Sequence, residues 1–62
     1  MNVKEKYFIL WVAHDHSDEG QFEIMAFDIV EAAIKGTKLI NQKKQYIDAI
    51  MEEDVYINQF KD

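Results

Sequence analysis

The sequence YFILWVA, from Tyr7 to Ala13, is the longest uninterrupted apolar run in this chain of 62 residues. Aromatic and aliphatic residues of this kind favour extended structure, so the run predicts a β-strand over about Lys4–Ala13. Side chains alternate between the two faces of a strand, so the odd-numbered residues of the run share one face and the even-numbered residues share the other. Because both faces are apolar, we expect this strand at the centre of a sheet.

A hairpin is expected to follow the first strand. The segment His14–Gly20 is rich in Asp, Ser and Gly, the residues typical of turns, and predicts a projecting loop. The next segment, Gln21–Phe27, alternates and predicts a second strand. Its even-numbered residues share one face, and its odd-numbered residues, Met25 and Phe27 among them, share the other.

A helix is expected to begin at Ile29. Asp28 at the N-cap, with Glu31 three residues later, resembles a capping box. Apolar residues then recur at helical spacing and predict the stripe that faces the sheet, which comprises Ile29, Val30, Ala33, Ile34, Thr37 and Ile40. Gly36 lies inside this pattern and marks either a close approach to the sheet or a weak point of the helix.

The rest of the chain is interpreted as a second helical segment and a third strand. A second apolar stripe comprises Tyr46, Ile47, Ile50 and Met51. A break is expected near residues 41–43, because one continuous helix would overhang the sheet. Val55–Phe60 alternates and predicts the third strand.

Together these elements predict an α+β fold in a single small domain of residues 1–62. The predicted element order is β-β-α-(α)-β, with a three-stranded antiparallel sheet in the order 2-1-3 and the helices on one face. This strand order places the doubly apolar first strand in the centre, in agreement with its composition. The other face of the sheet is left without a covering layer.

The composition argues against several classes of protein. The chain has no cysteine, which excludes disulfides and thiolate metal sites. Its formal net charge of −5 disfavours nucleic acid as a partner, because phosphate binding needs a positive surface. The longest apolar run is far shorter than the roughly 20 residues that span a membrane, and no signal-peptide cleavage site follows it. We therefore expect a cytoplasmic protein with no membrane partner.

The loop at His14–Glu19 is the one segment with ligand chemistry. Histidines two residues apart on an extended chain point the same way and suit zinc. A complete site would need further ligands from the same loop, such as Asp18 or Glu19. A solvated loop, or a pH-sensitive contact of His14 and His16 with a partner, explains the same residues. We expect no metal and no cofactor.

Catalysis is not expected. Ser17 is the only serine, and its neighbour His16 lacks a third group that would orient it as a base. The chain contains only Gly20 and Gly36 as glycines, so it has no Gly-rich phosphate loop. A domain of this length also offers little volume for a substrate pocket of about 300 Å³ or more.

The sequence holds more apolar surface than one helical layer can cover, and such surface marks contact with another protein. We expect a non-catalytic protein-binding module, for which two modes of binding the partner are open. In the first, acidic residues act as a DNA mimic in a basic groove of the partner, namely Asp15, Asp18, Glu19 and Glu23, aided by Asp48, Glu52 and Glu53. In the second, the bare sheet face docks by apolar contact through Trp11, Met25 and Phe27. The alternative without a foreign target is a small structural or regulatory homodimer.

The layout also resembles that of small phage proteins that disable a host enzyme. The residues that carry the resemblance are the first strand (Phe8–Val12), the acidic loop, Phe22-Glu23-Ile24 and the helix start at Asp28–Ala33. Among such proteins are a phage inhibitor of host RNA polymerase and a phage antitoxin against a host RNase toxin. The resemblance covers most of the chain as a pattern and carries over no target-binding residue. It implies a stoichiometric inhibitor of a bacterial protein, with a role in host takeover or anti-defence.

Overall fold

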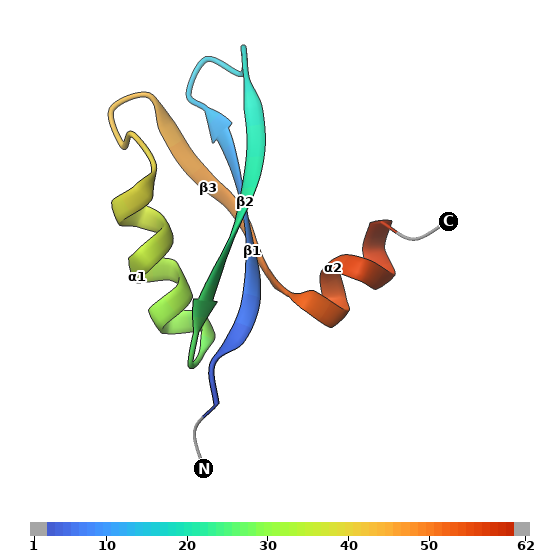
Figure 1. Cartoon of the computed structure of the whole chain (residues 1–62). Helices are drawn as coiled ribbons and strands as arrows, with labels where there is room; N and C mark the ends of the chain where they lie inside the picture. Colours follow the sequence, from blue (N-terminus) through green and yellow to red (C-terminus); the bar gives the residue numbers. More distant parts are fainter. Residues whose placement is uncertain (1–2, 61–62) are drawn as a thin grey trace.

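The computed structural model describes residues 3–60 of the chain, so the first two and last two residues of the predicted domain lie outside the described residues. Strands β1 (Glu5–Ala13), β2 (Glu19–Ala26) and β3 (Gln45–Glu52) form one antiparallel sheet in the order β2-β1-β3. Helix α1 (Ile29–Leu39) connects β2 to β3, and helix α2 (Glu53–Phe60) follows β3 (Figure 1). The predicted α+β class and the strand order 2-1-3 are confirmed.

The third strand lies earlier in the chain than predicted. Gln45–Glu52 is β3 and pairs with β1, although its apolar residues suggested a helix. The pairing with β1 explains why this strand was predicted as a helix. Leu10 pairs with Ala49 and Trp11 pairs with Ile47, so Asp48 is the extra residue of a β-bulge. A bulge shifts the alternation by one residue, so Ile47 and Ile50 share a sheet face at a spacing of three, which imitates a helix.

The segment predicted as the third strand is helical. Val55–Phe60 belongs to α2, whose first turn carries Glu53 and Asp54. Acidic residues at a helix N-terminus stabilise it through the helix dipole. The place beside β1 that the prediction gave to this segment is taken by β3. The element order is therefore β-β-α-β-α.

The two helices lie on opposite sides of the sheet (Figure 1), whereas the sequence predicted both on one side. Tyr56 of α2 stacks on Phe8, with ring centres 3.9 Å apart and planes inclined by 10°. Helix α1 packs on the face that carries Tyr7 and Ile9, which alternation places opposite Phe8. Part of the face expected to be bare is therefore covered by the protein itself.

The core lies between β1 and α1. Its buried residues are Tyr7, Ile9, Ala26 and Ala32, with Phe22, Ile24, Ile47 and Ile50 packed around them. Burial raises the pKa of the Tyr7 phenol, and the negative charges of Glu5 and Glu52 raise it further.

Helix α1 faces the sheet with its small residues. Ala32 and Gly36 are buried, whereas Val30 and Ile34, predicted to face the core, are 64% and 53% exposed. A Cβ atom at Gly36 would lie 3.2 Å from Ile9 Cδ1. Of the two explanations for this glycine, the structure shows close approach to the sheet. A helix that lies this near a sheet brings small side chains, and not the largest aliphatic ones, to the contact.

Candidate protein-binding surfaces

Strand β2 is an edge of the sheet, and one hydrogen bond fixes which of its backbone groups face outward. The Ala13 N–H donates to the Asp18 carbonyl at 2.9 Å, just beyond the last strand pair. Hydrogen-bonded pairs alternate along an antiparallel ladder, so the even-numbered residues of β2 bond to β1. The odd-numbered residues, from Glu19 to Met25, therefore direct their backbone N–H and C=O groups toward the free edge.

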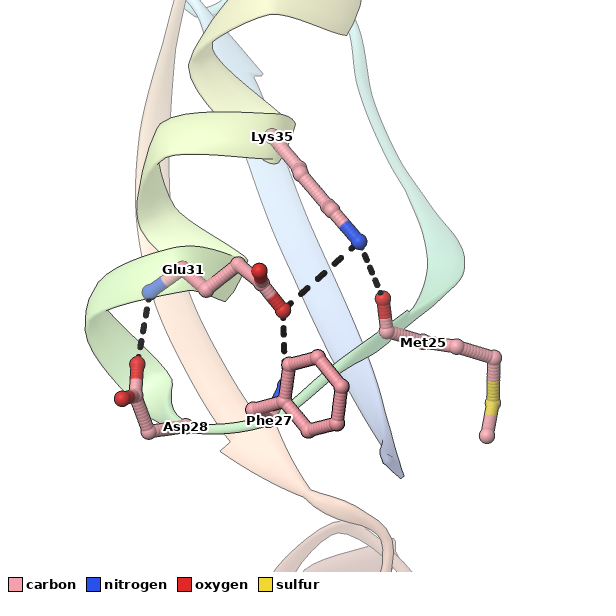
Figure 2. A network of polar contacts seen from close by, with 5 residues as sticks. All are labelled: Met25, Phe27, Asp28, Glu31 and Lys35. Atoms are coloured by element: carbon pink, nitrogen blue, oxygen red, sulfur yellow. Dashed lines mark hydrogen bonds and ion pairs between the residues drawn. The ribbon is translucent and has the colours of Figure 1, made fainter. Parts of the chain in front are cut away.

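Side chains cover the two ends of this edge. At one end, the Glu19 N–H donates to Asp18 Oδ1 at 2.9 Å. At the other end, Lys35 Nζ of α1 donates to the Met25 carbonyl at 2.9 Å, and the Phe27 N–H donates to Glu31 Oε1 at 2.7 Å (Figure 2). Covering edge groups in this way limits unwanted pairing with other chains.

The same network starts helix α1. The Glu31 N–H donates to Asp28 Oδ1 at 2.8 Å, which confirms Asp28 as the N-cap. Glu31 also forms an ion pair with Lys35 at 3.7 Å between Oε1 and Nζ. Figure 2 shows the Glu31 carboxylate between the Phe27 N–H and the Lys35 ammonium group. Glu31 thus accepts from the N–H of Phe27, the residue before the N-cap. In a standard capping box, the corresponding side chain accepts from the N–H of the N-cap residue itself.

Acidic side chains of β2 gather on the face opposite α1. Glu19 pairs with Val12 and Glu23 pairs with Phe8, so both side chains lie on the Phe8 face. Lys6 Nζ lies 3.8 Å from a carboxylate oxygen of Glu23 and 3.5 Å from one of Glu53. Glu19, Glu23 and Glu53, here called the acidic strip, therefore lie on one side of the sheet, with Gln21 between the first two and Lys6 between the last two.

The remaining acidic residues of the first predicted mode do not join one surface. Asp48 lies at the bulge of β3, on the opposite edge of the sheet from β2. Glu52 pairs with Tyr7 and therefore lies on the α1 side of the sheet. The structure brings Glu23 and Glu53 together and separates them from Asp48.

The loop between β1 and β2 holds Asp15 and Asp18 at one end of the sheet. The Ser17 hydroxyl donates to Asp15 Oδ1 at 2.6 Å and the Ser17 N–H donates at 3.0 Å, and these bonds lower the pKa of the Asp15 carboxyl. His14 Nε2 donates to the Gln42 carbonyl at 3.1 Å. Within residues 3–60, no three His, Asp or Glu side chains are grouped to hold a metal ion.

The residues of the second predicted mode do not share one bare sheet face, and apolar docking itself stays a prediction. Trp11 lies on the α1 side of the sheet, and a Cβ atom at its pairing partner Gly20 would lie 2.6 Å from Trp11 Cζ2. Met25 pairs with Lys6 and points to the opposite side. Phe27 follows the end of β2, where Lys4 Nζ lies 5.4 Å from the centre of its ring.

Sequence reasoning missed the outer surface of α1. Val30 and Ile34, here called the outer stripe, face away from the sheet, and a groove of about 420 Å³ lies beside Ile34. The sequence did contain a signal for which side of α1 faces the sheet. Ala32 and Gly36 are small residues four positions apart, and such a pair marks the close-packed side of a helix.

A second groove lies between α1 and the edge strand β2. It has a volume of about 420 Å³ and is here called the helix–edge groove, lined by Ile24, Met25, Lys35, Lys38 and Leu39. Leu39 is 65% exposed beside it. The groove therefore joins apolar surface to the backbone groups of a free strand edge.

Comparisons with protein-family models, curated proteins and solved structures gave no match. No helix among the described residues has the length and apolarity needed to cross a membrane.

Proposed function

We propose that this chain is a non-catalytic protein-binding module of the kind that phages use to inhibit a bacterial host protein, such as a nuclease, a polymerase or a defence factor. The observation that carries the proposal is the outer stripe, because surface helices normally turn polar residues to water. Val30 is 64% exposed and Ile34 is 53% exposed, beside a groove that a partner side chain can enter. Exposed apolar patches next to grooves are typical of protein-binding surfaces.

Charge supports the same function. The formal net charge is −5, and the acidic strip lies on the side of the sheet away from α1. A negative surface steers a basic partner toward the chain and raises the rate of encounter. The resemblance to small phage inhibitors adds the kind of target, which is a host protein that acts on nucleic acid.

Affinity capture from a bacterial lysate tests the proposal with a matched pair of variants. Ile34→Glu places a charge in the outer stripe, and Ile57→Glu places the same charge at an α2 residue of similar exposure, 51%. Burying an isoleucine side chain stabilises a contact by about 1.5–3 kcal/mol, so Ile34→Glu should weaken capture about tenfold or more. Ile57→Glu should capture the same protein as the unmodified chain. Equal capture by the Ile34→Glu variant would show that the outer stripe is not the docking surface.

Salt separates apolar docking from charge mimicry. Binding through acidic residues should weaken steeply between about 50 and 500 mM salt, because the Debye length shrinks from roughly 14 to 4 Å. Apolar docking through the outer stripe should change little over the same range. Binding that does not respond to salt rejects the DNA-mimic version of the function.

The alternative is a small structural or regulatory homodimer, and the charges of α1 favour it. Asp28 and Glu31 lie at its N-terminus, and Lys35 and Lys38 lie toward its C-terminus. Two copies of α1 packed antiparallel along the outer stripe would bring opposite charges together. Sedimentation of the purified chain decides this alternative, since a monomer at micromolar concentration removes it.

A further inference from the structure

The two edges of the sheet differ in their capacity to accept another strand. The edge formed by β3 is interrupted by the bulge at Asp48, which bends a strand and breaks the repeat of its backbone groups. Strand β2 pairs with β1 without a register shift from Glu19 to Ala26. The regular edge is therefore β2.

The covered ends of β2 define a window. Asp18 accepts from the Glu19 N–H, and Lys35 donates to the Met25 carbonyl. Between these two contacts lie the outward backbone groups of Gln21 and Glu23, together with the Glu19 carbonyl and the Met25 N–H. At about 3.4 Å per residue the window spans roughly 20 Å, which fits an added strand of about six residues.

The two sides of this window differ in chemistry. On the side away from α1, the side chains of the window are Glu19, Gln21, Glu23 and Met25 in that order, so the two carboxylates flank a neutral amide. On the α1 side, the window borders the helix–edge groove, which is apolar through Ile24 and Leu39. Lys35 and Lys38 line the same groove and repel a basic side chain that points into it.

We propose that β2 accepts an extended segment of a partner protein in which basic and apolar side chains alternate, the basic ones beside Glu19 and Glu23 and the apolar ones in the helix–edge groove. This inference rests on the proposed protein-binding function and names the segment that the partner supplies. Backbone hydrogen bonds supply affinity in such strand addition, and alternate side chains supply specificity. The lysines of α1 fix the register, because a shift by one residue would turn the basic side chains toward them.

The test uses two synthetic six-residue peptides of identical composition, with capped ends. In the first, lysine alternates with valine, and in the second, the lysines and the valines form separate blocks. NMR titration with each peptide to about 1 mM, followed by amide hydrogen exchange, reports which backbone groups become protected. The alternating peptide should slow exchange at the Gln21 and Glu23 amides, whereas the block peptide should not.

Variants of Glu23 separate the backbone contact from the charge. Glu23→Gln keeps the outward N–H and removes the charge, so peptide affinity should fall about one and a half- to fivefold, as for an exposed ion pair. Glu23→Pro removes the charge and the outward N–H, and an edge strand tolerates proline at such a position. Peptide binding by Glu23→Pro should fall well below that of Glu23→Gln. If Glu23→Pro does not fold, the exchange pattern of the unmodified chain still decides the question.

Three results would overturn the inference: no binding of the alternating peptide, equal binding of the block peptide, or protection that falls on β3 and not on β2. The Ile34→Glu variant should bind the alternating peptide as the unmodified chain does, because Ile34 lies outside the helix–edge groove. The two proposals therefore fail separately. Loss of lysate capture with Ile34→Glu supports the outer stripe, whereas protection of the Gln21 amide supports strand addition.

Discussion

Replacing Gly20 by alanine should destabilise the protein through its single tryptophan. A Cβ atom at Gly20 would lie 2.6 Å from Trp11 Cζ2, 2.8 Å from Cε2 and 3.0 Å from Nε1. These distances are shorter than carbon atoms tolerate, and the indole ring is rigid, so the whole Trp11 side chain must move. The perturbation therefore acts on one identified contact between β1 and β2.

The magnitude follows from two opposed effects. Overpacking a tight contact costs about 1–3 kcal/mol. Alanine in place of glycine inside a strand recovers about 0.5–1 kcal/mol, because glycine loses more backbone freedom on folding. The free energy of unfolding should therefore fall by about 1–2 kcal/mol. A loss of this size lowers the melting temperature of such a small domain by roughly 5–15 °C.

Trp11 is the only tryptophan of the chain, so its fluorescence reports directly on the displaced ring. We expect a shifted emission maximum in folded Gly20→Ala and a lower urea midpoint, measured by fluorescence and by circular dichroism. Gly36→Ala is the comparison variant: its Cβ would lie 3.2–3.3 Å from the ends of the Ile9 and Ile47 side chains, which can shift more easily than the rigid indole ring, so it should cost less than Gly20→Ala. Gly20→Ala with unchanged emission and unchanged stability would refute the placement of the indole over Gly20.

Three further substitutions test the loop and the helix start. Asp28→Ala removes the N-cap bond to the Glu31 N–H and should lower the free energy of unfolding by about 1 kcal/mol in urea titration. His16→Gly should raise it by about 0.5 kcal/mol, because His16 holds a φ of 61° that glycine adopts without strain; an unchanged or lower value would contradict this. Hydrogen bonds from Ser17 depress the Asp15 pKa, so the stability they add is present above the unfolded pKa of Asp15 and is lost as pH falls through its folded pKa. Ser17→Ala should return that pKa toward its ordinary value in an NMR titration, and the carboxyl should then protonate at higher pH than in the unmodified chain.

The part of the fold near the first strand was predictable because its signals are local. An uninterrupted apolar run gave β1, alternation gave β2, and Asp28 gave the start of α1. The later part was not predictable from periodicity, because the bulge at Asp48 places Ile47 and Ile50 three residues apart on one face. A register shift of this kind depends on the pairing with β1 and is not visible in β3 alone.

The candidate site was predicted less well than the fold, for a related reason. The apolar stripe of α1 was assigned to the core because its residues are hydrophobic. In the structure, the close approach at Gly36 leaves room only for small residues on the side of α1 that faces the sheet. Val30 and Ile34 were consequently placed inside, and Trp11 was placed outside although it covers Gly20. Which face of an element is buried depends on the distance between layers, which composition does not give.

The edges of the sheet link stability to function in this chain. A three-stranded sheet has two edges, and both must be kept from pairing with other chains at random. At β3 the bulge at Asp48 interrupts the edge, and at β2 the side chains of Asp18, Glu31 and Lys35 cover its two ends. Glu31 and Lys35 belong to the first turns of α1, so the residues that start the helix also shorten the available edge. Within residues 3–60, the regular length of edge that remains lies between the acidic strip and an apolar groove, so a strand that pairs there must match both.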